Sequence, residues 1–175
     1  MKTLTLLRHA KSGWDDPALR DFERPLNPRG RRAARTIARE MRRLELGFDH
    51  VVASPARRVI ETLDEVGRVF GPIEPNFERT LYLASPETLL DIVQQADDGA
   101  DRLLLVGHNP GLETLALRLA GPGSLHDALA EKYPTATLAE IALPAQAWAD
   151  VREGTGELRR FIRPRDLDPE LGPED

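Results

Sequence analysis

The stretch that decides the fold is LTLLRHAKS, residues 4–12, close to the N-terminus. Its apolar part is too short to cross a membrane and is bounded by charged residues, which predicts a strand buried on both faces of a sheet. The strand ends at Arg8 and His9. Because open α/β sheets bind ligands at the carboxyl edge of their strands, we expect both side chains to lie in a binding site.

A second stretch repeats this arrangement far along the chain, RLLLVGHNPG at residues 102–111. It predicts another buried strand, and His108 follows this strand directly. A third, shorter strand is predicted at residues 49–53, and Arg57 and Arg58 open a helix just after it. These strand ends predict two imidazoles and at least two guanidinium groups at one edge of the sheet.

Four predicted helix starts carry the same signal, an Asn or Ser followed by proline. The first residue caps the helix, and proline fits the first helical position because its missing N–H would have no partner there. The starts are Asn27-Pro28, Ser54-Pro55, Ser85-Pro86 and Asn109-Pro110. Because helices follow strands repeatedly, the predicted fold class is α/β, a three-layer αβα sandwich with a mostly parallel central sheet and helices on both faces.

Two further strands are predicted nearer the C-terminus, at residues 136–143 and 158–162. Both alternate partly between apolar and polar residues, so we expect them to be antiparallel or at the edge of the sheet. The chain has 175 residues, 41% of them hydrophobic, and is expected to form one domain over residues 1–163. Residues 164–175 are rich in proline and acid, and we expect them to be a flexible tail without a catalytic role.

The composition limits the cellular compartment and the classes of binding partner that we expect for this protein. The chain has no cysteine, which excludes disulfides and thiolate metal sites and suits a reducing cytoplasm. The sequence has no signal-peptide pattern and no apolar run long enough to span a bilayer, so we expect neither export nor a membrane partner. A net charge of −5 argues against a surface committed to nucleic acid.

The predicted helix at residues 28–44 carries many arginines, mostly away from its apolar positions. They are Arg31, Arg32, Arg35, Arg39, Arg42 and Arg43. These side chains form either a docking face for an acidic partner or a solvated helix surface. Charged helix faces are usually solvated, so we favour the second interpretation.

The predicted cluster of imidazoles and guanidinium groups suits a dianion, and phosphate is the obvious candidate. Arginine supplies planar, bidentate donors, and helix N-termini supply backbone N–H groups. A metal site is not expected, because the four histidines of the chain include no closely spaced pair. The sequence also lacks the glycine-rich nucleotide loops and the nucleophile elbow of serine hydrolases, and no cofactor is expected.

Three segments resemble, in order and spacing, the signatures of the histidine phosphatase superfamily (branch 1), which includes cofactor-dependent phosphoglycerate mutases and acid phosphatases. They are LRHA at residues 7–10, SPARRVIET at 54–62 and VGHNPG at 106–111. The small size of the chain, with RPLNPRG at residues 24–30 and LYL at 81–83, is most similar to the SixA-type phosphohistidine phosphatases. Ala10 departs from the Arg-His-Gly form of the first signature, as in a known subset of the family.

The resemblance implies a phosphoglycerate mutase-like fold and a role for each matching residue. His9 would accept the phosphoryl group, and Arg8, Arg58 and His108 would hold the phosphate. The fourth position after the serine of the second segment is Arg58, so Arg57 would be a neighbouring surface cation. Nearby guanidinium groups disfavour a charged imidazole and would keep His9 neutral and nucleophilic.

No carboxyl group of the sequence stands out as the proton donor. Larger relatives place one beside the leaving oxygen, whereas here Asp21, Glu78 and Glu87 are all candidates. A phosphoramidate depends less on such a donor than an alkyl phosphate does, because a departing imidazole is readily protonated. The sequence therefore predicts a metal-independent phosphatase that works through phosphohistidine on His9 and dephosphorylates phosphohistidine on a protein.

Two alternatives use the same cluster of side chains. The protein could be a general phosphomonoesterase that acts on phosphorylated small molecules. It could also be a non-catalytic module that binds phosphate or a phosphoprotein, although intact His9 and His108 argue against this alternative.

Overall fold

The computed structural model describes residues 1–172 and contains a six-stranded sheet in the order β3-β2-β4-β1-β5-β6. The strands are β1 Lys2–Arg8, β2 His50–Ala53, β3 Asn76–Phe77, β4 Arg102–Gly107, β5 Leu138–Leu143 and β6 Glu157–Ile162. The first four are mutually parallel, whereas β5 is antiparallel to both β1 and β6. This confirms the mostly parallel sheet and the prediction for the two strands near the C-terminus, since β5 is antiparallel and β6 lies at the edge. The sequence does not predict β3, which has only two residues.

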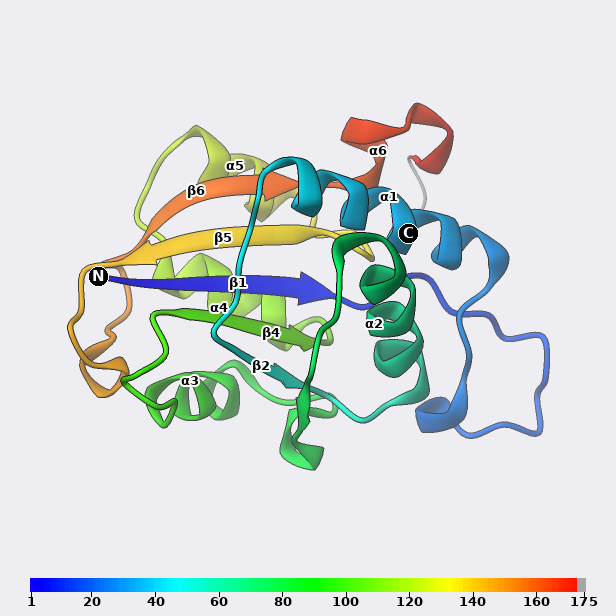
Figure 1. The fold of residues 1–175 in the computed structure, drawn as a ribbon, viewed down its shortest axis with the longest axis horizontal. Coiled ribbons are helices and arrows are strands. Elements are labelled where there is room, and N and C mark those ends of the chain that lie inside the picture. Colours follow the sequence, from blue (N-terminus) through cyan, green and yellow to red (C-terminus); the bar gives the residue numbers. More distant parts are fainter. Residues whose placement is uncertain (173–175) are drawn as a thin grey trace.

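Helices cover both faces of the sheet and complete three layers (Figure 1). They are α1 Pro28–Arg43, α2 Arg57–Phe70, α3 Pro86–Gln94, α4 Gly111–Leu119, α5 Ser124–Glu131 and α6 Pro164–Leu167. Leu7 of β1 belongs to the apolar cluster under α1 and α2, whereas Leu6 belongs to the cluster under α3, α4 and α5. Successive residues of a strand point to opposite faces, so a fully apolar strand serves both layers. No helix in the described part of the chain is long and apolar enough to cross a membrane.

Two of the four predicted helix caps form as expected. The side-chain oxygen of Asn27 accepts a hydrogen bond from the backbone N–H of Gly30 at 2.7 Å. The hydroxyl of Ser85 likewise accepts from the backbone N–H of Thr88 at 3.2 Å. Each bond satisfies an N–H group that has no partner inside its helix, so these residues define where α1 and α3 begin.

The other two helices begin one or two residues after the proline of the predicted start, and α2 begins at Arg57, where the two arginines were expected to open it. α2 begins three residues after Ser54, and α4 begins two residues after Asn109. The hydroxyl of Ser54 accepts from the backbone N–H of Ala56 at 3.3 Å, and it also binds the ring of His108, at 2.7 Å. Asn109 donates to the carbonyl oxygen of Tyr133 at 3.1 Å, although its own oxygen still accepts from the backbone N–H of Glu113. Both residues have long-range partners that local sequence cannot show.

Part of the arginine surface of α1 pairs with carboxylates of the same chain. Arg31 and Arg35 both contact Glu65 of α2, at 3.2 and 3.0 Å. Arg32 contacts Asp168, beyond α6, at 2.6 Å. These ion pairs join α1 to α2 and to the C-terminal segment, which weakens the interpretation of this helix as a docking face.

The prediction of a flexible tail from residue 164 is wrong for residues 164–172. This segment forms α6 and the 3₁₀ helix Pro169–Leu171, and it contacts α1. Leu171 is only 8% exposed and belongs to the cluster under α1 and α2, while Arg29 donates to the carbonyl oxygen of Glu170 at 2.5 Å. A single buried leucine among prolines and acids is too sparse a pattern to reveal this contact. Residues 173–175 lie outside the described part of the chain.

A pair of glycines tests how closely α1 packs against the loop after β1. A Cβ on Gly30 would lie 2.1 Å from the carbonyl oxygen of Lys11, whereas a Cβ on Gly67 of α2 would meet no other segment within 4 Å. We expect Gly30→Ala to lower the free energy of unfolding by about 1–3 kcal/mol, because backbone must move to make room. We expect Gly67→Ala to raise it by about 0.5–1 kcal/mol through helix propensity. Urea denaturation measures both, and equal stability of the two variants would contradict the close packing.

Candidate active site

The register of β1 and β4 places two histidines side by side. Arg8 pairs with Gly107 at the ends of these parallel strands, so the residue that follows each of them is a histidine. The backbone N–H of His9 donates to the carbonyl of Gly107 at 3.2 Å, and the ring centroids of His9 and His108 are 5.2 Å apart. The two imidazoles that the sequence placed at one sheet edge therefore lie together.

Arg58, the second residue of α2, reaches both histidines. Its Nε donates to Nε2 of His9 at 3.4 Å, and its Nη2 donates to Nδ1 of His108 at 3.3 Å. The Arg58 residue is only 3% exposed. Arg57 is turned by about 100° around the helix and pairs at the surface with Glu61, at 2.9 Å. The structure thus brings Arg58, and not Arg57, to the histidines.

Hydrogen bonds define the tautomer of His9. Its Nδ1 lies 2.7 Å from the carbonyl oxygen of Ala10, which can only accept, so Nδ1 carries the proton. Nε2 therefore holds the lone pair that accepts from Arg58. Burial, together with the nearby charges of Arg58 and Arg8, lowers the pKa of His9 well below its ordinary value of 6.5. At neutral pH the ring is uncharged, and Nε2 has the free electron pair that a nucleophile needs.

His108 has the opposite tautomer. Its Nδ1 accepts from Arg58, so the proton lies on Nε2, which donates to the hydroxyl of Ser54 at 2.7 Å. Burial and then the charge of Arg58 lower the pKa of His108 to about 3. The Tyr82 ring packs against the imidazole in a T-shaped arrangement, with centroids 5.3 Å apart. His108 is therefore neutral and held on three sides.

Asp21 holds Arg58 from the other side of the guanidinium group. Its Oδ2 accepts from Nη2 of Arg58 at 3.0 Å and from the hydroxyl of Tyr82, while its Oδ1 accepts from Nε of Arg24 at 3.1 Å. Partial burial acts to raise the pKa of Asp21, but the Tyr82 hydrogen bond and the positive charge of Arg58 lower it to about 2. Asp21 is thus a carboxylate at neutral pH and has no proton to donate.

The other two candidate proton donors lie elsewhere. Glu87 is exposed and pairs with Arg118 at 2.9 Å. Glu78 is also exposed, between β3 and α3, and does not line the pocket around the histidines. Of the three candidate carboxyl groups, only Asp21 reaches this pocket.

The catalytic pocket, as we call the space around the two histidines, is open and has a volume of about 400 Å³. It is lined by Arg8, His9, Lys11, Ser12, Trp14, Asp21, Arg24, Arg58, Leu83, His108, Asn109 and Thr135. Among the described residues, four of these carry a positive charge and one is a carboxylate. Guanidinium groups at this density suit a phosphoryl group that is part of a larger molecule.

Several residues of the catalytic pocket were not predicted as site residues. Arg24 is 8% exposed and donates to the hydroxyl of Ser12 at 2.6 Å. Its guanidinium group also lies 3.6 Å from the centre of the Trp14 ring. The segment RPL at residues 24–26 was a signal for Arg24, whereas nothing local marks Ser12 or Trp14. They belong to the loop after β1, whose path depends on the whole fold.

The donor set of the catalytic pocket favours an anion over a cation. Its charged side chains are mostly Lys and Arg, which donate hydrogen bonds and do not ligate metals. Within residues 1–172, no three His, Asp or Glu side chains are grouped so that they could hold a metal ion. Metal-independent activity stays a prediction.

The chain belongs to the histidine phosphatase superfamily (branch 1), whose family model matches residues 4–82. This range includes Arg8, His9 and Arg58. An uncharacterised protein of Mycobacterium tuberculosis is 34% identical over 163 residues, which covers 91% of this chain and all of that protein. The six-stranded sheet with its helices matches the phosphoglycerate mutase-like α/β fold of structural relatives.

Two solved structures narrow the comparison to the SixA type. A protein of Agrobacterium tumefaciens assigned as phosphohistidine phosphatase SixA is 31% identical, with a TM-score of 0.79 over 92% of this chain and 97% of that chain. A protein of Nakamurella multipartitia with the same assignment is 30% identical, with a TM-score of 0.79 over 93% of this chain and 96% of that chain. The chain is therefore a phosphatase similar to the SixA proteins.

The lowered pKa of His108 predicts how stability depends on pH. Its pKa is about 3 in the folded chain and about 6.5 when unfolded. Below pH 6.5 the unfolded state therefore binds one more proton, and the free energy of unfolding falls as the pH falls. Between pH 7 and pH 5 this costs about 2 kcal/mol. We expect His108→Gln to lose about 2 kcal/mol less than the wild type over this interval in urea denaturation. Equal losses would show that His108 is not buried in its neutral form.

Proposed function

We propose that this phosphatase removes the phosphoryl group from phosphohistidine on a protein, through a phosphohistidine intermediate on Nε2 of His9. The observation that carries the proposal is the hydrogen bonding of His9, which keeps the proton on Nδ1 and the lone pair on the side of Arg58. The assignment of the two SixA relatives supports the same substrate class.

The first step transfers the phosphoryl group to His9. The lone pair of Nε2 forms a bond to phosphorus, and the P–N bond of the substrate breaks with its electron pair staying on the departing imidazole. Arg8 and Arg58 line the pocket, and their guanidinium groups balance the charge on the three equatorial oxygens. Arg58 gives up its hydrogen bond to His9 and donates to these oxygens instead. Asp21 stays bound to Arg58 and keeps the guanidinium group in place.

The second step hydrolyses the intermediate. A water molecule attacks phosphorus from the face that the substrate imidazole has left, and the P–Nε2 bond breaks. The electron pair returns to Nε2, one proton of the water stays on the attacking oxygen and the other goes to a phosphoryl oxygen. Phosphate leaves, and His9 regains its neutral form with the proton on Nδ1. The hydrogen bond from Nδ1 to the carbonyl of Ala10 holds the ring orientation through both steps.

The state of Asp21 supports phosphohistidine over an alkyl phosphate as the substrate. An alkoxide needs a proton as it leaves, and Asp21 is the carboxyl group that lines the pocket in the described part of the chain, with a pKa of about 2. A phosphohistidine ring that is protonated on its other nitrogen leaves as neutral imidazole. This leaving group needs no proton from a carboxylic acid. The P–N bond formed on His9 is of the same type as the P–N bond broken in the substrate.

His108 supports the proposal as a group that changes its protonation when phosphate arrives. In the structure its Nδ1 accepts from Arg58. A dianion beside the ring raises the pKa of His108, because negative charge favours the protonated imidazole. Protonated Nδ1 then donates a hydrogen bond to a phosphoryl oxygen, while Nε2 keeps its bond to Ser54.

The proposal is tested by comparing kcat/KM on a phosphohistidine peptide and on an alkyl phosphate, with and without a chelator. We expect a preference for the peptide of about 100-fold or more, because a general acid contributes about 10²–10⁴ to the rate and none is available for the alkyl group. The chelator should change neither rate. His9→Ala should abolish both turnover and trapping of labelled phosphate on the protein.

Two outcomes of this comparison would contradict the proposal in different ways. Rapid hydrolysis of the alkyl phosphate, with the phosphohistidine peptide untouched, would replace the substrate by phosphorylated small molecules. Turnover that persists in His9→Ala would overturn the intermediate itself.

A second test separates two roles of Asp21. If Asp21 acts as the partner of Arg58, Asp21→Asn should lower kcat/KM by about tenfold or more on both substrates. The ratio of the two kcat/KM values should then stay the same. As a general acid, it would support only the alkyl phosphate, so the ratio would change. Glu87→Gln is the matched control, because Glu87 lies outside the catalytic pocket and pairs with Arg118.

A further inference from the structure

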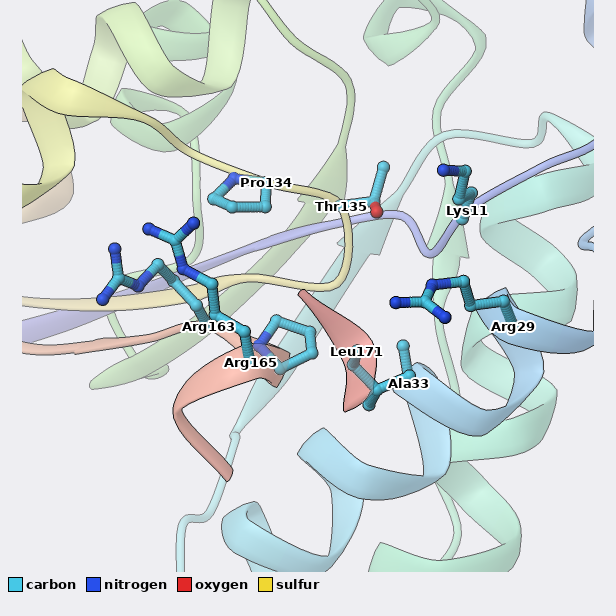
Figure 2. Close-up of a pocket in the computed structure, with 9 residues that line it drawn as sticks. Lys11, Arg29, Ala33, Pro134, Thr135, Arg163, Arg165 and Leu171 are labelled. Carbon is cyan, nitrogen blue, oxygen red and sulfur yellow. The ribbon is translucent and has the colours of Figure 1, made fainter. Parts of the chain in front are cut away.

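Two apolar side chains differ from the rest of the lining of the catalytic pocket. Trp14, in the loop after β1, is 71% exposed, and Leu83, before α3, is 54% exposed. The other described lining residues are all polar, and they are buried or partly buried. Lys11 and Thr135, for example, come from the loop after β1 and the loop before β5 (Figure 2). The exposed members of the lining are therefore its apolar members, and we call Trp14 and Leu83 the apolar rim.

Trp14 is held in place although it is exposed. The guanidinium carbon of Arg24 lies 3.6 Å from the centre of the indole ring. Arg24 itself is fixed by the carboxylate of Asp21, at 3.0 Å, and by the hydroxyl of Ser12, at 2.6 Å. One face of the indole thus lies on an anchored cation, while most of the ring surface stays open to solvent. A ligand that packs on this ring has little side-chain freedom to remove, which favours binding.

The backbone of Leu83 is strained. Its φ of 51° lies in the left-handed region, which is unfavourable for leucine and suits glycine or asparagine. The preceding residue is Tyr82, whose ring packs against His108, and α3 begins three residues later, at Pro86. Strained residues persist where the surrounding structure holds them, and they are common at binding sites. Because the side chain is more than half exposed, core packing does not explain a leucine at this position.

The leaving group of the proposed reaction lies on the side of this rim. In phosphoryl transfer the attacking and leaving atoms are roughly in line, on opposite sides of phosphorus. His9 is 7% exposed and lies at the floor of the pocket with Arg58 and His108, which are also buried. The leaving group therefore points away from the floor and toward solvent, where the exposed lining is the apolar rim.

We infer that Trp14 and Leu83 recognise the imidazole ring of the phosphohistidine substrate. This inference rests on the proposed function and deepens it, because it names the residues that contact the leaving group. A phosphohistidine ring that is protonated on its other nitrogen carries positive charge. Such a ring packs favourably on an indole, by the same attraction that holds the guanidinium group of Arg24. The side chain of Leu83 offers apolar surface to the carbon atoms of the ring.

The kinetic test compares two small substrates with a P–N bond, N-phosphoimidazole and unsubstituted phosphoramidate, of which only the first has a ring. We expect Trp14→Ala to lower the ratio of their kcat/KM values about tenfold relative to the wild type, because an aromatic contact has about this strength. Loss of the Arg24 contact alone would affect both substrates equally, since they carry the same phosphoryl group. An unchanged ratio would overturn the inference. A loss confined to phosphohistidine peptides would also overturn it, because Trp14 would then contact flanking residues.

Phe77→Ala is the matched control for Trp14→Ala. Phe77 is an aromatic residue that is 46% exposed, but it does not line the catalytic pocket. The ratio of the two kcat/KM values should therefore stay at the wild-type level in this variant. An equal fall in both variants would show that the effect is not specific to the rim.

Leu83→Asn separates recognition from folding. Asparagine tolerates the left-handed conformation better than leucine does, so the urea midpoint should be equal to that of the wild type or higher. The ratio of the kcat/KM values for N-phosphoimidazole and phosphoramidate should nevertheless fall, by about threefold or more, because apolar surface is lost at the rim. A lower midpoint with an unchanged ratio would show that Leu83 serves folding alone and would overturn its assigned role.

A binding measurement keeps the inference separate from the proposed function. Phenylphosphonate and methylphosphonate carry the same anionic group, neither is a substrate for P–N cleavage, and only the first has a ring. By calorimetry, we expect the wild type to bind phenylphosphonate about tenfold more tightly, and Trp14→Ala to lose most of this difference. Phenylphosphonate should also shield Trp14 from quenching by acrylamide. The other tryptophan, Trp148, is fully buried and does not report on the pocket.

The two measurements distinguish failure of the inference from failure of the proposed function. If neither P–N substrate is hydrolysed, the proposed function fails, and the phosphonate titrations still decide whether the rim recognises a ring. If the two phosphonates bind the wild type with equal affinity, the inference is overturned even where hydrolysis is observed.

Discussion

The pairing of β1 with β4 is the constraint on which the rest of the structure depends. Arg8 lies opposite Gly107, so the next residue of each strand emerges at the same level of the sheet edge. A slip of one residue would turn an imidazole to the other face, because side chains alternate along a strand. Such a slip would also bring Arg8 into the place of Leu7, which is fully buried in the cluster under α1 and α2. The core layers therefore set the position of His9 and His108.

Burial and charge together give the site its protonation state. Arg58 is almost wholly buried, and a buried cation is costly unless it is paired. Asp21, from the long loop after β1, supplies the paired charge at 3.0 Å. The same burial, with the positive charges nearby, keeps the rings of His9 and His108 neutral. The ion pair and the two neutral imidazoles are thus parts of one electrostatic arrangement.

The sequence predicted the elements with strong local patterns and missed those with long-range partners. Runs of a few residues predict the buried strands and the helix caps at Asn27 and Ser85, and these elements form as expected. Ser54 also has a capping pattern, but its hydroxyl also binds a ring 54 positions away in the sequence. Short elements such as α5 carry too little periodicity to be distinguished from a loop, and the segment at residues 164–172 is held by contacts with α1 that its composition does not reveal.

By itself, the sequence determined the α/β class, the family, and which histidines and arginines end the strands or begin a helix. Each of these depends on the order of residues over a short distance. Only the tertiary structure decided that Asp21 is an ionised partner of Arg58 and that Ser54 orients His108. Hydrogen-bond partners and pKa values depend on which side chains meet across the packed layers. The sequence pattern does not contain the distances between those side chains.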